Sequence, residues 1–374
     1  MAYSRVSEHS SMLFDATRNE AYARAIHSLV RPESVVLDLG AGMGLHGLLA
    51  AAAGASRVYL AEPQPVVHAA REAAQANRLA ERVVILQNRI EEVPLEEPVD
   101  LIVSVLTGNL LYSEDLLPSL FHARDRYLKP GGHLLPDRAQ LWLAPLCAPA
   151  LHAKFISRWS APVMGLDYSA GRRFLANEIL WPSRESLAEA RQLGEGVPLV
   201  DLDLMTAVSG DCRATATCSI ETSGLCHGLL GWIQIRLLDQ WLSSHPSAPE
   251  VHWSPALLPL DPPLQLERGE LISVAVDRPF QGDWTWTVSA GAGVRRHSTF
   301  FSGAHGVAEL RAISPHNRPG LNEAGSEVLR ILDMMGQGLS NQAIADSVAQ
   351  SGDKDPIGAL RRVQAIALRY GRTG

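Results

Sequence analysis

The fold is decided by the stretch VVLDLGAGMG at residues 35–44. Apart from Asp38, its first five residues are apolar, as in a buried strand, and the alanine-rich stretch 45–53 behind it favours a helix. Gly40 and Gly42 let the backbone approach a ligand closely, and a helix that starts after such a turn points free N–H groups at that ligand. The stretch therefore predicts a strand, a glycine turn and a helix that can hold a nucleotide cofactor.

Helix and strand patterns alternate on both sides of this turn. The second strand ends in Glu62, about twenty residues beyond the turn, where a doubly wound sheet places an acid for ribose hydroxyls. Such an alternation is typical of an α/β domain with a parallel sheet. The expected helices cover residues 19–30, 45–53 and 68–77, and the expected strands cover residues 35–39, 57–61, 82–87 and 99–104.

Length and composition indicate a soluble protein of two or three domains. Its 374 residues exceed what one hydrophobic core usually serves, and 46% hydrophobic with 20% charged residues is an ordinary globular balance. The formal net charge of −7 argues against a broad electrostatic grip on nucleic acid and leaves only a local basic patch open.

Four cysteines lack any CxxC spacing, so the sequence indicates neither a zinc site nor a disulfide framework, and no metal is expected. Residues 1–14 lack the apolar core of a signal peptide, and no stretch reaches the ~18 apolar residues of a membrane span. We therefore expect a cytoplasmic protein with no membrane partner.

The pattern changes after Gln140. Short runs of β-type residues, separated by turns rich in Gly, Pro and Ser, continue to about Thr299 and predict an all-β domain. The last 60 or so residues then predict a compact helical unit. Its expected helices cover residues 321–332, 340–350 and 358–370.

Three interpretations of this C-terminal unit stay open. The outline fits a DNA-binding helix-turn-helix, which Arg361, Arg362 and Arg369 on the last helix would favour. It also looks like the small winged-helix element by which enzymes that tailor ribosomal peptides hold a leader peptide, and the strands of that element would lie between Ser298 and Ile313. A helical cap that only packs on the β domain is the third interpretation.

From residue 9 to about residue 290 the chain resembles the protein arginine methyltransferases. The resemblance rests on VVLDLGAGMG, on AEP at 61–63, on IEEV at 90–93 and above all on LLYSEDLLPSLFHARDRYLKPGGHLLPDRAQLWLAP at 110–145. It implies a class I methyltransferase domain with a Rossmann-like parallel sheet, followed by a β-barrel domain with a helical dimerisation arm. The expected boundaries are 1–140, 141–299 with the arm at about 150–178, and 300–374 for the C-terminal unit.

The resemblance also implies S-adenosylmethionine as the cofactor and S-adenosylhomocysteine as its product. Arg18 then pairs with the carboxylate of the cofactor, Glu62 holds the ribose and Glu91 binds the adenine amino group, which are chemically apt pairings. The alternative is that Arg18 and Glu91 are merely solvated surface residues. The complete expected set of cofactor-binding residues is Arg18, Asp38, Gly40, Gly42, Glu62, Pro63, Ile90 and Glu91.

The expected substrate loop, residues 104–114, departs from the family pattern. The family clamps arginine between two glutamates; here only the second, Glu114, is present, and Val105 occupies the first position. A guanidinium would lose one bidentate partner, and an unpaired cation in a desolvated site costs several kcal/mol. The sequence therefore argues against ordinary arginine methylation. The expected substrate pocket comprises Tyr3, Met12, Val105, Asn109 and Trp253.

Asp15 and His252 match positions that form an acid–imidazole pair in the family, and with Glu114 they are the expected catalytic residues. An aspartate that orients a histidine produces a general base that works near neutral pH. The alternative is that Asp15 and His252 only tie the N-terminal helix to the barrel and that Glu114 is a surface acid.

The main hypothesis is an S-adenosylmethionine-dependent methyltransferase that modifies a peptide or protein at a site other than ordinary arginine. The substrate could be a ribosomal peptide precursor held by the C-terminal unit. The alternatives are an arginine methyltransferase, a small-molecule methyltransferase of secondary metabolism, and a non-catalytic regulator that binds DNA or cofactor. A homodimer that forms through the barrel arm is expected in each enzymatic case.

Overall fold

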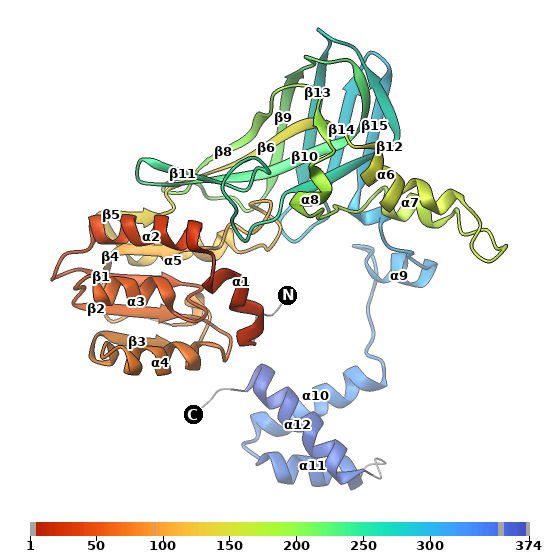
Figure 1. Ribbon diagram of the computed structural model, residues 1–374. Coiled ribbons are helices and arrows are strands. Elements are labelled where there is room, and N and C mark those ends of the chain that lie inside the picture. The colour runs from red at the N-terminus through yellow and green to blue at the C-terminus, as the bar shows by residue number, and fades with distance from the viewer. Residues whose placement is uncertain (1–4, 94, 351–354, 372–374) are drawn as a thin grey trace. The chain divides into compact units, whose positions relative to one another are not determined.

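The computed structural model describes residues 5–93, 95–350 and 355–371 (Figure 1). The chain forms two compact units, which divide between Ala304 and His305. Tyr3, one of the expected pocket residues, lies outside the described residues.

The first part of the larger unit is a five-stranded parallel sheet in the order β3-β2-β1-β4-β5. All five residues of β1 are buried, as expected for a central strand that helices cover on both faces. The sheet consists of β1 (Val35–Leu39), β2 (Arg57–Ala61), β3 (Val83–Leu86), β4 (Val99–Ser104) and β5 (Leu128–Leu135). Its helices are α1 (Ser10–Leu13), α2 (Ala16–Leu29), α3 (Leu45–Ala52), α4 (Val67–Ala76) and α5 (Leu117–Tyr127), with short 3-10 turns η1 (Val6–His9), η2 (Ala80–Arg82) and η3 (Ile90–Glu92).

Antiparallel strands form the second part. One sheet has the order β11-β10-β6-β7, with β12 paired to β10 and β8 paired to β6, and a second sheet has the order β15-β14-β13-β9. Alternating burial along β13 and β14 places one face of the second sheet in the core. The strands are β6 (Arg138–Cys147), β7 (Arg191–Gln192), β8 (Val197–Asp203), β9 (Cys212–Ser219), β10 (Gly224–Leu237), β11 (Gln240–Ser243), β12 (Ala256–Leu266), β13 (Leu271–Arg278), β14 (Thr285–Ala290) and β15 (Gly293–Ser298).

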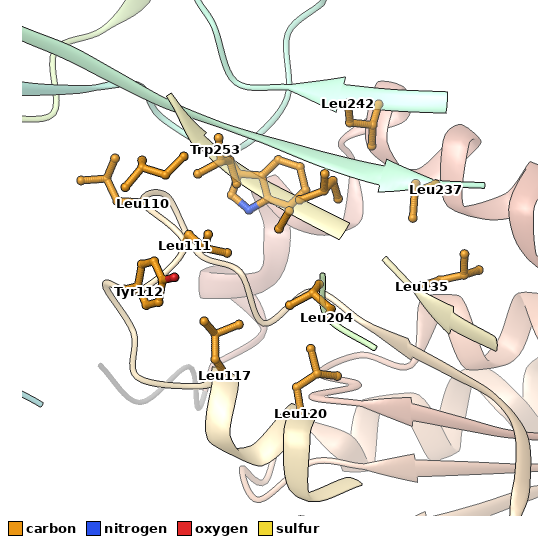
Figure 2. Close-up of a cluster of buried hydrophobic side chains, with 14 of the residues drawn as sticks. Leu110, Leu111, Tyr112, Leu117, Leu120, Leu135, Leu204, Leu237, Leu242 and Trp253 are labelled. Carbon is orange, nitrogen blue, oxygen red and sulfur yellow. The ribbon is translucent and has the colours of Figure 1, made fainter. Parts of the chain in front are cut away.

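A shared hydrophobic cluster joins the parallel sheet to the barrel (Figure 2). Leu110, Leu111 and Tyr112, from the loop after β4, are almost fully buried and lie in the same cluster as Trp253 of the barrel. Burying such side chains stabilises the fold by roughly 1.5–3 kcal/mol each. The loop expected to bind substrate is therefore part of the core that fixes the barrel on the sheet.

A helical excursion leaves the barrel between β6 and β7. It comprises α6 (Pro149–Phe155), η4 (Ser157–Ser160), α7 (Gly171–Leu175) and α8 (Arg184–Leu187). Arg172 of α7 donates two hydrogen bonds to Asp261 of β12, of 2.8 and 2.7 Å, and so ties the excursion to the barrel wall. Its span contains the range expected for the arm.

The smaller unit is helical and has its own core. It contains α9 (Val307–Ala312), α10 (Glu323–Gly336), α11 (Asn341–Gln350) and α12 (Pro356–Tyr370). Ile331, Ile344 and Val363 are fully buried where the last three helices meet.

One expectation for this unit is wrong. The winged-helix interpretation needed strands between Ser298 and Ile313, but β15 ends at Ser298, and the 3-10 turn η5 (Thr299–Phe301) and then α9 follow it. Glu309 explains the helix: its carboxylate accepts from the N–H of Gly306 at 2.9 Å and caps the first turn. Within the described part of residues 305–374 the structure has helices and no strand.

Candidate active site

The glycine turn after β1 has the conformation that its sequence predicted. Gly40 and Gly42 adopt φ values of 70° and 53°, in the left-handed region that favours glycine. A Cβ atom on Gly42 would lie 2.7 Å from Nδ1 of His9, and one on Gly40 would lie 2.7 Å from a methyl carbon of Leu106. His9 comes from η1 and is buried at this turn, a role that its local sequence does not indicate.

Two buried carboxylates flank the turn. Asp38 accepts from the N–H of Gly47 at 2.8 Å, and burial raises the pKa of Asp38 to about 7. Glu62 accepts from the N–H of Gln64 at 2.8 Å and of Gly42 at 3.1 Å, and burial raises the pKa of this carboxyl group as well. These backbone contacts fix the direction of Glu62 at the edge of the sheet.

Arg18 lies on the first turn of α2, where Asp15 caps the helix by accepting from its N–H at 2.9 Å. Its guanidinium donates to the carbonyl oxygen of Met12 at 2.5 Å and to the side-chain oxygen of Asn19 at 2.8 Å. The residue is only 3% exposed, so the solvated-surface interpretation of Arg18 is wrong. A buried guanidinium at a cavity wall is well suited to bind an anionic group.

Glu91 is held by Ser119, a residue that no sequence motif marks. Ser119 of α5 donates to a carboxylate oxygen of Glu91 at 2.5 Å, and Arg89 lies 3.8 Å from the other oxygen. Although burial opposes it, the Ser119 hydroxyl keeps the pKa of Glu91 below its ordinary value. Glu91 is therefore an ionised acceptor.

One cavity of about 750 Å³ brings most of the expected site residues together. Asp38 lies behind the glycine turn and Asp15 behind His252, and neither is among the lining residues. The expected residues that line the cavity are Met12, Arg18, Gly40, Gly42, Glu62, Pro63, Ile90, Glu91, Val105, Asn109, Glu114, His252 and Trp253.

The loop from Val105 to Asp115 forms one wall of this cavity. Gly108, Leu111 and Asp115 have positive φ values of 54°, 61° and 57°. For a residue such as Leu111 this conformation costs on the order of 1–3 kcal/mol, which the surrounding structure must offset. The loop passes so close to itself that a Cβ on Gly108 would lie 3.1 Å from the carboxyl carbon of Glu114.

His252, which also lines the cavity, belongs to the expected acid–imidazole pair. Nδ1 of His252 lies 2.9 Å from Oδ2 of Asp15, and the backbone N–H of His252 donates to the same oxygen at 2.8 Å. Burial lowers the pKa of His252 despite the opposing effect of Asp15, so the ring is neutral at pH 7. A neutral imidazole whose Nδ1–H is held by a carboxylate presents Nε2 as a proton acceptor.

The polar groups that line the cavity are suited to an organic cofactor. Within ranges 5–93, 95–350 and 355–371, no cluster of three or more His, Cys, Asp or Glu side chains is arranged to hold a metal ion. The glycine turn, with Arg18 and two carboxylates around it, provides partners for an anionic group, for hydroxyls and for an amine.

Across the ranges 5–93, 95–350 and 355–371, no helix combines the length and apolar character needed to cross a membrane.

Comparison with known proteins agrees with this geometry. Residues 36–132 match a family described as a methyltransferase domain, and residues 137–283 match the arginine methyltransferase oligomerization subdomain. The chain is 30% identical over 321 residues to the probable protein arginine N-methyltransferase 6 of Arabidopsis thaliana, a match that covers 74% of this chain and 73% of that protein. It is 32% identical over 321 residues to protein arginine N-methyltransferase 6 of Xenopus laevis, covering 80% of this chain and 94% of that protein.

Solved structures show the same fold. The Trypanosoma brucei PRMT1 enzyme-prozyme heterotetrameric complex with AdoHcy contains a chain that aligns with a TM-score of 0.70 at 24% identity, over 79% of this chain and 99% of that one. The expected class I sheet followed by a β-barrel is thereby confirmed.

Proposed function

Because this chain belongs to the protein arginine methyltransferase family, we propose that it transfers a methyl group from S-adenosylmethionine to a side-chain nitrogen of arginine in a protein or peptide. The resemblance that the sequence motifs suggested is confirmed, and with it an S-adenosylmethionine-dependent methyltransferase. The observation that carries the choice of acceptor is that Glu114 and His252, whose ring Asp15 holds from behind, line the same cavity as the cofactor-type residues.

The residues present fit the cofactor. A Cβ on Gly40 would lie 2.7 Å from Leu106, and one on Gly42 would lie 2.7 Å from His9. Only glycine therefore lets this turn pack so closely where it lines the cavity. Arg18 would pair with the carboxylate of S-adenosylmethionine, Glu62 would accept hydrogen bonds from the ribose hydroxyls, and Glu91 would accept one from the adenine amino group. When bound, S-adenosylmethionine supplies an electrophilic methyl group on its sulfonium sulfur.

Glu114, His252 and Asp15 are the residues that would act on the arginine acceptor. Glu114 would accept hydrogen bonds from a guanidinium and hold one nitrogen toward the methyl group. A nitrogen that takes up a methyl group there would have to lose a proton. Neutral His252 has an unprotonated Nε2 that can accept the proton, and Asp15 stabilises the imidazolium that results.

The arm supports assembly with a second copy. Residues 137–283 match an oligomerization subdomain, and the tip of the arm exposes Val163, Met164 and Leu166, of which Met164 is 95% exposed. Apolar side chains gathered at the end of an excursion are typical of an interaction site. A homodimer through this arm is the proposed assembly.

The expected domain boundaries at 140 and 300 remain a proposal. Sheet and barrel share one hydrophobic core, and the two compact units divide between Ala304 and His305. For the C-terminal unit, helical packing leaves peptide binding, DNA binding and a simple cap as open roles.

A second candidate is the methylation of a peptide site other than arginine, and one observation favours it. Val105 lines the cavity at the position where the family has its other glutamate. The acids that residues 105–115 supply to the cavity are therefore Glu114 and its neighbour Asp115. The names of the relatives favour arginine, and this candidate therefore ranks second.

A panel of short peptides separates the two candidates. The peptides differ only at a central Arg, Lys, His, Asn or Ser, and each is incubated with the protein and methyl-labelled S-adenosylmethionine. Label that appears on the Arg peptide alone, with methylarginine after hydrolysis, supports the proposal. Label on one of the other peptides, with none on the Arg peptide, would support the second candidate instead.

A further inference from the structure

The substrate loop is held by the barrel at two points. In the middle of the loop, the side-chain oxygen of Asn109 accepts from the backbone N–H of Ser254 at 2.9 Å, two residues beyond His252. At the end of the loop, Asp115 contacts Arg278, the last residue of β13. Between these anchors lies Glu114, the acid that the proposed function assigns to the acceptor.

The Asp115–Arg278 contact is a two-point ion pair. The two terminal nitrogens of Arg278 donate to the two carboxylate oxygens of Asp115, at 2.6 and 2.8 Å. Asp115 also accepts from the backbone N–H of Gln281 at 2.9 Å. A bidentate guanidinium–carboxylate pair fixes the orientation of both groups as well as their separation.

Arg278 is unusually buried for a charged residue. Its side chain is 5% exposed, and its guanidinium lies 5.6 Å from the ring centre of Trp284. Removing a cation from water is unfavourable unless a good partner compensates it. Asp115 is that partner, so the burial of Arg278 and the position of the loop depend on each other.

The neighbouring residue provides a contrast. Asp277 of β13 pairs with Arg213 of β9 at 3.2 Å, but the side chains there are 45% and 82% exposed. An exposed pair of this kind contributes little to structure. The two ion pairs thus differ in burial and in their number of hydrogen bonds, and the Arg278 pair, unlike the Asp277 pair, includes a residue of the loop.

We propose that Arg278 is a positioning residue that, through Asp115, fixes the carboxylate of Glu114 in the acceptor site. The inference rests on the proposed function, in which Glu114 binds the acceptor. Asp115 follows Glu114 directly in the chain, and Glu114 already packs against Gly108, so a shift of Asp115 moves the Glu114 carboxylate. Displacement by about 1 Å can lower catalytic rates on the order of 100-fold.

The test compares Arg278→Met, Arg278→Lys and Asp115→Asn with the matched control Asp277→Asn. The acceptor is the arginine peptide that the wild-type enzyme methylates, and kcat and KM are measured separately for peptide and for S-adenosylmethionine. We expect Arg278→Met to lower kcat/KM for the peptide by roughly 10–100-fold while KM for S-adenosylmethionine changes less than about threefold. Arg278→Lys, which keeps the charge and one hydrogen bond, should recover part of the loss, and Asp277→Asn should match the wild type.

Hydrogen exchange of residues 105–116, measured without any acceptor, completes the test. Faster exchange in Arg278→Met and Asp115→Asn, but not in Asp277→Asn, is the expected result. Unchanged exchange, or faster exchange with an unchanged kcat/KM for the peptide, would overturn the proposal. If Arg278→Met does not fold, the exchange and the kcat/KM of Asp115→Asn decide whether the proposal stands. If the wild type methylates no arginine peptide, the proposed function fails, and the exchange data still decide whether Arg278 holds the loop.

Discussion

Nδ1 of His252 lies 2.9 Å from Oδ2 of Asp15, although 237 residues separate the two in the chain. Asp15 caps the helix that precedes the parallel sheet, whereas His252 belongs to the barrel. The Asp15 side chain is 3% exposed and that of His252 12%. The pair therefore joins the two halves of the cavity and also sets the tautomer of the histidine.

The pair determines the expected acid limit of activity. Burial lowers the pKa of His252 below its ordinary value, and Asp15 partly opposes the shift. The neutral base is therefore present at neutral pH and is lost only as the pH falls through a value below about 6.5. Asp15→Asn removes the opposing effect, so the acid limb of kcat should move to lower pH while kcat itself falls roughly 10–100-fold.

A pH series of kcat for the wild type and Asp15→Asn measures this. His27→Asn, an exposed change on the same helix, serves as the control and should leave both the limb and kcat unchanged. An acid limb that stays in place in Asp15→Asn would mean that His252 and Asp15 only tie the two parts together.

Restoring the second acid tests the interpretation of the substrate loop. Val105→Glu places a carboxylate on the cavity wall that also carries Glu114. We expect kcat/KM for an arginine peptide to rise at least about tenfold, because a second bidentate partner compensates the buried guanidinium. Val105→Gln has nearly the same shape without the charge and should not produce the gain. No gain with Val105→Glu would mean that the pocket differs from its relatives in more than this charge.

Gly42 should be intolerant of any side chain. Gly42→Ala places a Cβ 2.7 Å from Nδ1 of His9 at a φ of 53°. The ring must move out of the cavity wall, so the affinity for S-adenosylmethionine should fall on the order of 10-fold or more. Gly320→Ala, where a Cβ meets no atom within 4 Å, should bind as the wild type does. Equal affinities in the two variants would show that the glycine turn does not contact the cofactor.

The Arg172–Asp261 ion pair is one of the contacts that hold the arm on the barrel. Asp261→Asn weakens the two hydrogen bonds from Arg172, whose side chain is 34% exposed, so the free energy of unfolding should fall by about 1–3 kcal/mol. Because α7 belongs to the arm, dimerisation measured by sedimentation should weaken as well. The exposed Arg213–Asp277 pair provides the control, since Asp277→Asn should change stability by less than about 0.5 kcal/mol. If Asp261→Asn dimerises with unchanged affinity, the arm does not mediate assembly.

The sequence predicted most of the fold because strands and glycine turns have local patterns. The run at 35–39, the glycine turn and Glu62 follow periodicity and spacing, and the structure places them as expected. The prediction of winged-helix strands was wrong for a local reason as well, because the cap from Glu309 favours a helix where strands were expected.

Long-range contacts could not be predicted in the same way. His9 covers Gly42 and Ser119 holds Glu91 only because the fold brings them there, and neither residue type in its local sequence indicates such a role. The Asp115–Arg278 pair joins residues 163 positions apart and leaves no pattern in either segment. Departures such as Val105, by contrast, were visible because the surrounding motif is long.

Calorimetry of the purified protein with S-adenosylmethionine and S-adenosylhomocysteine tests whether the cavity binds the proposed cofactor. Glu62→Ala is measured beside the wild type, and Glu81→Ala, an exposed acid beside the same sheet, is the matched control. We expect micromolar binding of both ligands to the wild type and to Glu81→Ala, and its loss in Glu62→Ala, because two backbone N–H groups fix the orientation of the Glu62 carboxylate at the cavity. Absence of binding to the wild type, or full binding to Glu62→Ala, would contradict the proposed cofactor site.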